Sequence, residues 1–205
     1  MDEPRYPLLS LTRLRMGTDG AGVTTLVAGA RCPLSCRWCI NRRLLAEAPA
    51  ENVTAAELIE RLRIDELYFL ATGGGPTFGG GEPLLHAAFL KRFRELCPPL
   101  WRVRAETSLA VSEALLETAI GAADEFIVDC KDMNEEIYRR YTGGDGARMR
   151  RNLRTLLEAV GPERVHVRVP LIPGCNTPED QARSAELLRQ MGAERIELFD
   201  YVIRE

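Results

Sequence analysis

The sequence predicts an α/β fold, a partial (β/α)6 barrel in which six parallel strands alternate with helices and the sheet does not close. Three observations predict it. Six short segments have the composition or the alternation of β-strands, amphipathic helical segments separate most of them, and glycine-rich turns lie between strands and helices. At 205 residues the chain has the length of one domain, so we expect a single domain over residues 1–205.

The six predicted strands are rich in β-branched residues or alternate between polar and apolar residues. The first, residues 23–27, leads into a loop with three cysteines. In residues 165–169 valines occupy one face, and His166 and Arg168 occupy the other. One face of a barrel strand packs on helices and the other lines the interior, so we expect His166 to be an interior packing residue and not a ligand. The other strands are predicted at residues 76–78, 102–106, 125–129 and 195–199.

The predicted helices have start signals or apolar residues at helical spacing. Thr54 to Glu57 has the form of a capping box, which begins a helix that the glycines at 73–75 end. Phe89 and Phe93 recur at helical spacing in the next helix, and we expect them in the core. Further helices are predicted near residues 112–120, near residues 148–160, and from Thr177-Pro178 onward.

Three cysteines, Cys32, Cys36 and Cys39, lie within eight residues at the spacing C-x-x-x-C-x-x-C. We call residues 30–39 the cysteine loop. A loop this short must curl to present all three sulfurs to one centre. A cubane iron-sulfur cluster normally takes four cysteines, so three would leave one iron without a protein ligand.

Two other interpretations of these cysteines are weaker. A structural zinc site needs a fourth cysteine or histidine at short spacing, and His86 and His166 lie far along the chain. Buried thiols or disulfides are disfavoured because the cysteines are so closely spaced, and because Arg31 and Arg37 would favour thiolates.

Composition and charge exclude several classes of partner. The net charge is -3, and 27 basic residues are spread among 30 acidic ones, so we expect no nucleic-acid partner. Residues 1–4 lack the features of a signal peptide, and no apolar run could span a bilayer, so we expect a cytoplasmic protein with no membrane partner. The remaining cysteines, Cys97, Cys130 and Cys175, are scattered, which fits a reducing compartment.

The cysteine loop, with Trp38 directly before its third cysteine, resembles the cluster loop of the radical S-adenosylmethionine (radical SAM) superfamily. Further segments resemble, in order, those of the glycyl-radical-enzyme activases, whose best-known member activates pyruvate formate-lyase. These segments are Asp19-Gly20-Ala21-Gly22, Gly79-Gly80-Gly81-Glu82-Pro83, Asp129-Cys130-Lys131 and residues 168–174. The resemblance extends from about residue 19 to residue 201, and it implies a partial barrel of the radical SAM type.

The resemblance also implies a chemistry. One 4Fe-4S cluster would be held by the three cysteines of the loop, with S-adenosylmethionine on the open iron. Reductive cleavage would give a 5'-deoxyadenosyl radical, which in the activases abstracts a hydrogen from a backbone glycine of a partner enzyme, while the protein supplies position and protection. The implied partners are that glycyl radical enzyme, as a protein substrate, and flavodoxin or ferredoxin as electron donor. No cysteine lies between Cys39 and Gly79, so we expect no ferredoxin-like insert.

Two segments would form the centre of the cofactor site. The resemblance implies that residues 79–81 hold the methionine amino group, and the absence of side chains there would let the backbone approach closely. A flexible turn is the alternative. Lys131, one of two lysines in the chain with Lys91, lies two residues after Asp129 and so on the same strand face. Its implied role is to neutralise the methionine carboxylate or to contact the substrate, and the alternative is an interior ion pair with Asp129.

Other implied site residues come from separate parts of the chain. Glu106-Thr107 and Asp129 would lie near the methionine carboxylate and a monovalent cation. Arg168 would shape the substrate or adenosyl site, or pair with a carboxylate for structure. Asp19 would lie near the radical target, although Asp-Gly-x-Gly is also a common turn sequence. The ring of Trp38 would shield the cluster, and its backbone would meet adenine.

The predicted site has three groups of residues. The catalytic group is Asp19, Lys131 and Arg168; the cofactor-binding group is Trp38, Gly79, Gly80, Gly81, Glu82, Glu106, Thr107, Asp129, Lys131 and Arg168; and the cluster ligands are Cys32, Cys36 and Cys39.

Three positions depart from the family pattern. Arg31 precedes the first cysteine, where glycine is usual, and Glu106 replaces the usual aspartate, which puts the cation site in doubt. The histidine that usually follows the last strand is absent from Asp200-Tyr201-Val202, which could open the barrel mouth. The alternatives to an activase are a radical SAM enzyme that modifies a peptide or small molecule, and a non-catalytic cluster-binding protein. The presence of residues 79–82 and Lys131 argues against the latter, since a scaffold needs no cradle for S-adenosylmethionine.

Overall fold

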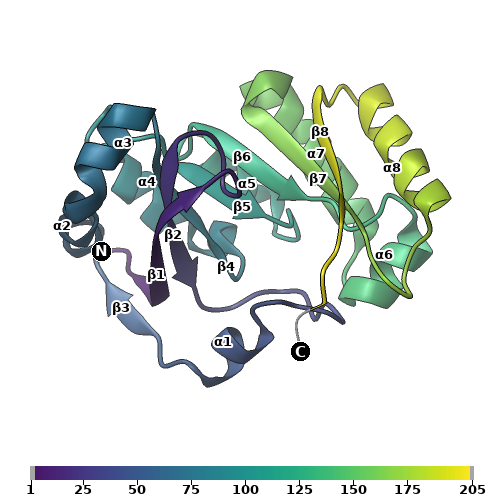
Figure 1. The fold of residues 1–205 in the computed structure, drawn as a ribbon, viewed down its shortest axis with the longest axis horizontal. Helices are drawn as coiled ribbons and strands as arrows, with labels where there is room; N and C mark the ends of the chain where they lie inside the picture. The colour runs from purple at the N-terminus through teal and green to yellow at the C-terminus, as the bar shows by residue number, and fades with distance from the viewer. Residues whose placement is uncertain (1–2, 204–205) are drawn as a thin grey trace.

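The parallel strands predicted from the sequence form the centre of one sheet. The computed structural model describes residues 3–203; Met1, Asp2, Arg204 and Glu205 lie outside the described residues, and with them part of the amino-terminal segment compared above with signal peptides. Six strands run parallel in a single series (Figure 1). In spatial order they are β2 (Val23–Gly29), β4 (Gly75–Gly80), β5 (Arg104–Thr107), β6 (Glu125–Asp129), β7 (Val165–Leu171) and β8 (Arg195–Asp200). The predicted α/β class and the six parallel strands are confirmed.

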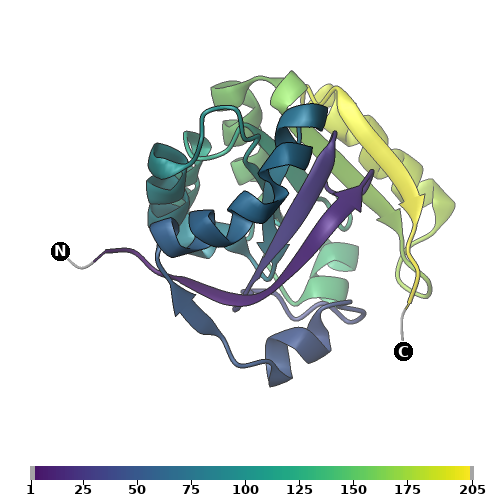
Figure 2. The same cartoon turned by 60° about the vertical axis from the view of Figure 1, so that its left-hand side comes forward.

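Two antiparallel strands extend this sheet at one edge, and the sequence analysis missed both. β1 (Tyr6–Met16) pairs with β2, and β3 (Glu51–Val53) pairs with β1. The register of β1 shifts between Thr12 and Arg15, where Leu14 has a φ of 53°, so a regular alternation is lost there. Among the described residues, the edge strands β3 and β8 do not pair with each other, so the sheet stays open (Figures 1 and 2).

Helices lie along the outside of the sheet, with α2, α3 and α4 near its first parallel strands and α7 and α8 near its last (Figure 1). The Thr54 capping box forms, because the Thr54 hydroxyl accepts from the Glu57 backbone N–H at 3.3 Å and the Glu57 carboxylate accepts from the Thr54 N–H at 2.7 Å. The helices are α1 (Arg42–Glu47), α2 (Ala55–Leu62), α3 (Glu66–Thr72), α4 (Ala87–Leu96), α5 (Glu113–Ile120), α6 (Glu135–Thr142), α7 (Gly146–Val160) and α8 (Pro178–Gln190).

The single helix expected from Thr54 to the glycines at 73–75 is interrupted. A 3-10 turn, η1 (Arg63–Asp65), separates α2 from α3, and Gly73 ends α3 with a φ of 67°. The carboxylate of Asp65 is buried and accepts hydrogen bonds from the Thr25 hydroxyl at 2.7 Å and from Arg13 at 2.5 Å. These tertiary contacts to β1 and β2 account for the break, since they hold the turn against the sheet. The sequence analysis also missed α1 and α6.

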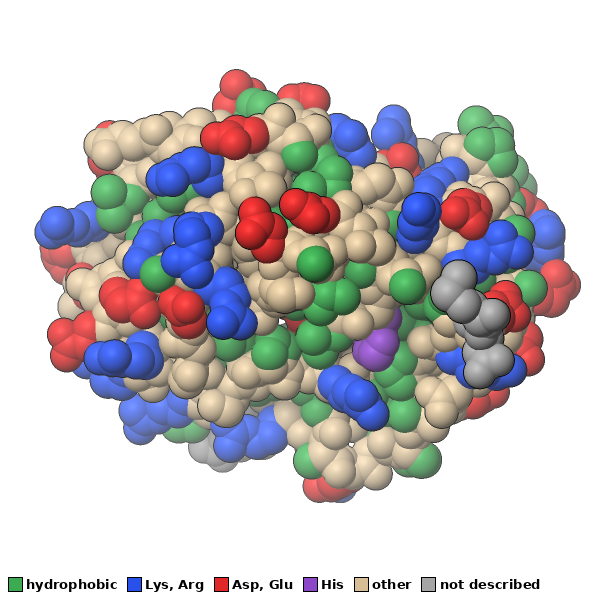
Figure 3. Space-filling view, turned by 180° about the vertical axis from the view of Figure 1, so that it is seen from behind, with side chains coloured by type: hydrophobic (Ala, Val, Ile, Leu, Met, Phe, Trp, Pro, Cys, Tyr) green, Lys and Arg blue, Asp and Glu red, His purple; other side chains and the backbone are tan. Residues whose placement is uncertain are grey.

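The core lies between the sheet and the helices. The valines of β7 are fully buried there, whereas His166 and Arg168 are half-buried on the opposite, inner face, as the alternation predicted. Phe89 and Phe93 are buried and pack with Phe78 of β4, which confirms their assignment to the core. On the face shown in Figure 3, acidic and basic side chains are interspersed. Within residues 3–203, no helix combines the length and the apolar composition that crossing a membrane requires.

A buried asparagine fixes the loop that follows β5. The side-chain amide of Asn152, in α7, donates to the backbone carbonyls of Leu109 and Val111, both at 2.9 Å. Leu109 has a φ of 56°, a conformation that disfavours any residue with a Cβ. The amide therefore holds in place a loop that local preferences alone would not form.

We expect Asn152→Ala to lower the free energy of unfolding by about 2 kcal/mol, because two carbonyls in a buried region lose their donor. The measurement is urea denaturation of both proteins. Asn52→Ala is the control, since Asn52 is exposed in β3 and should tolerate the same change with little effect. Equal losses in the two variants would contradict this role for Asn152.

Candidate active site

The cysteine loop follows directly from the carboxyl end of β2. Its three cysteines line one cavity of about 540 Å³, together with Arg31, Arg42 and neighbouring apolar residues. Cys32 is exposed, and Cys36 and Cys39 are half-buried. All three cysteines of the loop therefore border a single space, and their role as cluster ligands stays a prediction.

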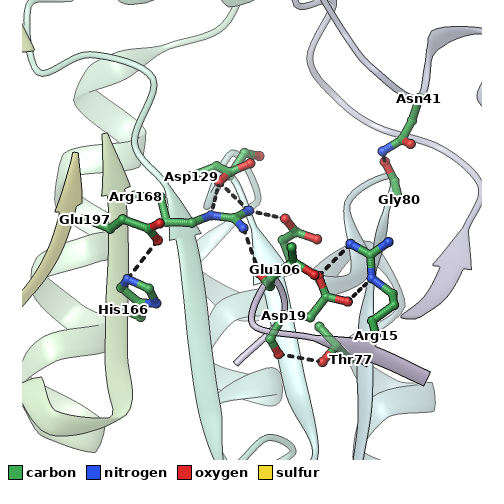
Figure 4. A network of polar contacts seen from close by, with 12 residues as sticks. Arg15, Asp19, Asn41, Thr77, Gly80, Glu106, Asp129, His166, Arg168 and Glu197 are labelled. Atoms are coloured by element: carbon green, nitrogen blue, oxygen red, sulfur yellow. Dashed lines mark hydrogen bonds and ion pairs between the residues drawn. The ribbon is translucent and has the colours of Figure 1, made fainter. Parts of the chain in front are cut away.

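Contacts with three other parts of the chain fix the loop. On one side, the backbone N–H groups of Ser35 and Arg37 donate to carbonyls at the end of α6, at 2.8 and 2.9 Å. On the other side, Asn41 donates from its side chain to the carbonyl of Gly80 at 2.9 Å (Figure 4). The hydroxyl of Tyr201, beyond β8, donates to the carbonyl of Trp38. The segment after the last strand thus closes on the loop, where the absence of a histidine had suggested an open mouth.

The donor set suits an iron-sulfur cluster better than a single ion. Within residues 3–203, no three His, Cys, Asp or Glu side chains converge closely enough to hold one metal ion. Three cysteines around a cavity instead match a cluster, in which each thiolate binds a different iron. Although Cys32 is exposed as a residue, partial burial of its thiol raises the pKa of that group to about 11, and burial also raises the pKa of Cys36. Both groups are therefore thiols at neutral pH, not the thiolates expected beside Arg31 and Arg37, and metal binding would have to displace their protons. The residues present fit a three-cysteine cluster.

The half-buried ring of Trp38 lies beside this cavity. It packs against a small apolar group of Tyr141, Ile172 and Cys175, and its indole N–H is buried without a partner in the described residues. The guanidinium of Arg37 lies 5.0 Å from the centre of the ring. The expected shielding of the cluster by the Trp38 ring and the expected contact of its backbone with adenine both stay predictions.

A Cβ at any of residues 79–81 would come within 3 Å of another part of the chain, and at Gly81 the atom it meets is backbone. A Cβ on Gly81 would lie 2.2 Å from the carbonyl oxygen of Arg31, and one on Gly80, whose φ is 83°, would lie 2.8 Å from the Cβ of Ala28. One on Gly79 would lie 2.8 Å from Oε2 of Glu106. Hence these glycines let β4 end against the cysteine loop, which is a structural need independent of any ligand.

Glu82 and Thr107, both predicted to bind cofactor, are instead engaged with each other. The buried Glu82 carboxylate accepts from the Thr107 hydroxyl at 2.7 Å, from the N–H and hydroxyl of Ser108 at 2.9 and 2.6 Å, and from the Leu84 N–H at 3.2 Å. Burial raises the pKa of the Glu82 carboxyl, and these hydrogen bonds oppose that rise. These side chains thus tie the end of β4 to the end of β5, and their expected contact with the cofactor stays a prediction.

Glu106, Asp129 and Arg168 meet on the inner face of β5, β6 and β7 (Figure 4), and Lys131, just beyond β6, joins them. Arg168 donates from Nε to Oδ1 of Asp129 at 2.9 Å and from Nη2 to the carboxylate of Glu106. Lys131 donates to the other oxygen of Asp129 at 2.9 Å. Asp129 and Arg168 are direct neighbours in the β6–β7 register, which is why their side chains meet. Both the expected Asp129–Lys131 ion pair and the expected pairing of Arg168 with a carboxylate are present.

The charges in this group shift one another's pKa values. Burial alone would raise the pKa of Asp129, but Lys131 and Arg168 outweigh it and lower the pKa to about 2. Burial would likewise lower the pKa of Lys131, yet the negative charge of Asp129 raises it to about 12. Burial raises the pKa of Glu106, and the nearby charge of Asp129 adds to that rise while Arg168 opposes it. Asp129, Lys131 and Arg168 are therefore charged at neutral pH.

Asp19 is held inside the protein by contacts with Arg15 and Thr77. Its side chain is buried and pairs with Arg15, whose Nη2 donates to Oδ1 at 2.8 Å, and its backbone carbonyl accepts from the Thr77 hydroxyl at 3.0 Å (Figure 4). Arg168 also reaches this segment, donating to the Thr18 carbonyl at 3.3 Å. Arg15 was not predicted from the sequence, because its pairing with Asp19 depends on the β1–β2 hairpin and no residue spacing indicates it.

His166 pairs with a residue of β8, since its Nε2 lies 3.2 Å from Oε2 of Glu197.

Comparisons with known proteins place this geometry in context. Residues 26–195 match the family described as the Radical SAM superfamily. The chain is 29% identical over 185 residues to the pyruvate formate-lyase-activating enzyme of Clostridium pasteurianum, covering 89% of this chain and 77% of that one. It is 27% identical over 191 residues to the pyruvate formate-lyase 1-activating enzyme of Escherichia coli (strain K12), covering 89% and 76%.

Among solved structures, Streptococcus suis SuiB bound to precursor peptide SuiA superposes with a TM-score of 0.66 at 14% identity. The match covers 86% of this chain but 38% of SuiB, so this chain spans well under half of that protein. At this identity the likeness shows the shared fold alone.

Gly81→Ala should lower the free energy of unfolding by about 1–3 kcal/mol, because the added methyl group meets backbone that cannot move away freely. It should also reduce the iron bound after anaerobic reconstitution, since the displaced carbonyl belongs to the cysteine loop. Gly121→Ala is the control, because a Cβ there meets nothing within 4 Å. An iron content equal to that of the wild type would mean that the loop does not depend on this contact.

A group whose pKa is lowered by folding stabilises the folded state above its unfolded pKa, near 4, and loses that contribution as pH falls. For Asp129, with a folded pKa of about 2, the loss should fall between about pH 4 and pH 2 and amount to about 2 kcal/mol. Asp129→Asn should be less stable at neutral pH and show a flatter acid limb in urea denaturation across this range. Glu113→Gln, the same kind of change at an exposed position, should follow the wild-type curve. A wild-type acid limb in Asp129→Asn would contradict the assignment.

Proposed function

The chain belongs to the radical SAM superfamily, and we propose that it binds one 4Fe-4S cluster through Cys32, Cys36 and Cys39 and cleaves S-adenosylmethionine reductively. The support is the cavity that these three cysteines share, next to the close-packed glycines at 79–81. When bound, the cluster supplies the electron that converts S-adenosylmethionine to methionine and a 5'-deoxyadenosyl radical. We further propose that the chain is one radical SAM domain with no second cluster.

The chain's own residues would bind and orient the cofactor. Lys131 and Arg168 bring positive charge to the inner face of the sheet, where they would hold the methionine carboxylate. The backbone of residues 79–81 would receive the methionine amino group, since no side chain stands in front of it. Trp38, with its ring packed beside the cysteine loop, would keep water from the reacting atoms.

We propose that the radical abstracts a hydrogen from a backbone glycine of a partner enzyme. Two observations support an activase. The relatives reported above, named for the activation of pyruvate formate-lyase, align with 89% of this chain. The described sheet is open between β3 and β8, which would admit an extended protein segment to its inner face. Flavodoxin or ferredoxin would donate the electron, and the proposed location is the cytoplasm.

The first test is anaerobic reconstitution followed by electron paramagnetic resonance, with and without S-adenosylmethionine, and an assay for 5'-deoxyadenosine. The wild type should bind about four irons per chain, give a reduced-cluster signal that shifts with S-adenosylmethionine, and form 5'-deoxyadenosine. Cys36→Ala should lose the iron and the product. Cys97→Ala, which removes a buried cysteine outside the loop, should retain both.

The second step adds a glycyl radical enzyme from the same organism. An activase should produce a glycyl radical signal in that partner. 5'-Deoxyadenosine without any glycyl radical would instead favour a peptide or small-molecule substrate. A cluster that does not respond to S-adenosylmethionine would overturn the proposed reaction.

A further inference from the structure

The inner face of β5 and β6 was expected to hold a monovalent cation. Hard cations bind oxygen atoms, and the expected donors were Glu106, Thr107 and Asp129. A cation can enter such a site only where those oxygens are free of other positive groups and face a common point. The arrangement of the three side chains therefore decides whether the site exists.

Each expected donor has another partner. Nη2 of Arg168 lies 2.7 Å from Oδ1 of Asp129, and the same nitrogen contacts the carboxylate of Glu106. Lys131 occupies Asp129 Oδ2. The Thr107 hydroxyl is turned to Glu82 and also accepts from the Leu109 N–H at 2.9 Å. The guanidinium thus lies between the two carboxylates that a metal cation would need to bridge, and these residues do not fit such a cation.

The charges on this face are also balanced without a metal ion. The ion-pair network contains two carboxylates, those of Glu106 and Asp129, and two cationic side chains, those of Lys131 and Arg168. The formal charges of these four groups sum to zero, and the separate Arg15–Asp19 pair is balanced as well. The side chains of Arg168, Glu106 and Asp129 are only 16%, 24% and 24% exposed. An added cation in this half-buried network would be left without a counter-charge, which is costly away from water.

We infer that Arg168 takes the place of the monovalent cation, so that this chain needs neither sodium nor potassium at its inner face. The guanidinium is a fixed, planar cation with several donors, and it bridges two carboxylates as a coordinated ion would. Removing it leaves Glu106 without its cationic partner and Asp129 with Lys131 alone, so one uncompensated negative charge faces the gap and creates the cation site that the wild type lacks. The apoprotein tests this without reference to the proposed reaction, whereas the consequence for S-adenosylmethionine rests on the proposed function.

The experiment compares thermal unfolding of the cluster-free protein in potassium chloride, sodium chloride and choline chloride at equal ionic strength. Choline is too large to replace a coordinated metal ion. The wild-type midpoint should be the same in all three salts. The midpoint of Arg168→Ala should be lower in choline and rise by about 3 °C or more in potassium or sodium, as expected for binding to the folded state alone.

Arg94→Ala is the matched control. Arg94 is 22% exposed and pairs with Asp124 at 3.2 Å, away from the inner face. This variant should be destabilised to the same extent in all three salts. If Arg168→Ala folds in potassium but not in choline, the inference is supported. If Arg168→Ala folds in neither salt, the same comparison is made with Arg168→Gln.

Three results would overturn the inference. One is a wild-type midpoint that rises in potassium or sodium relative to choline. Another is an arginine-free variant, Arg168→Ala or Arg168→Gln, that folds and is indifferent to the salt. The third concerns the affinity of the reconstituted protein for S-adenosylmethionine, which should agree within about twofold between potassium and choline. A tenfold loss of affinity in choline, about 1.4 kcal/mol, would show that a metal cation is needed. A protein that binds no S-adenosylmethionine in either salt contradicts the proposed function and leaves the apoprotein result to decide the inference.

Discussion

The close approach of two backbones, at Gly81 and Arg31, is the constraint on which the rest of the site depends. β2 and β4 are parallel neighbours, so their carboxyl ends meet at one edge, and the cysteine loop begins where β4 must end. The Arg31 carbonyl accepts from the Glu82 N–H at 2.9 Å, and this contact requires glycine at 81. Glu82 then ties the same segment to the end of β5. One contact thus sets the relative positions of three strand ends.

A second constraint is that charges facing a half-buried interior must be compensated. β5, β6 and β7 each place a charged side chain on their inner face, and the β6–β7 register brings opposite signs together. The cations of this group, Lys131 and Arg168, are also the side chains that an anionic ligand could contact. Stability and ligand binding therefore draw on the same side chains, so substitutions here affect both.

Local patterns were sufficient for part of this structure. The six parallel strands have β-branched or alternating residues, and the cysteine spacing defines the loop, so both could be predicted. β1 could not, because its bulge at Leu14 breaks the alternation. The helix α1, with six residues, is too short to show a clear period, whereas α6 has local signals, the Asn134 cap and the terminating Gly143, that the prediction did not use. The Asp129–Lys131 pair follows from strand geometry. The contacts of Arg15, Glu82 and Tyr201 depend on tertiary arrangement and left no local signal.

The open sheet has a consequence for how copies of this chain meet one another. β8 is an edge strand, and its unpaired backbone groups could bond to another strand, a route to self-association. Arg195, Glu197 and Asp200 are exposed along it, so two such edges would bring ionic groups together as they approached. Charged residues are a common defence of such edges. In β8 the open sheet therefore presents an edge that carries both charges and the exposed Leu198, and the order in which these side chains occur decides which strand can pair with it.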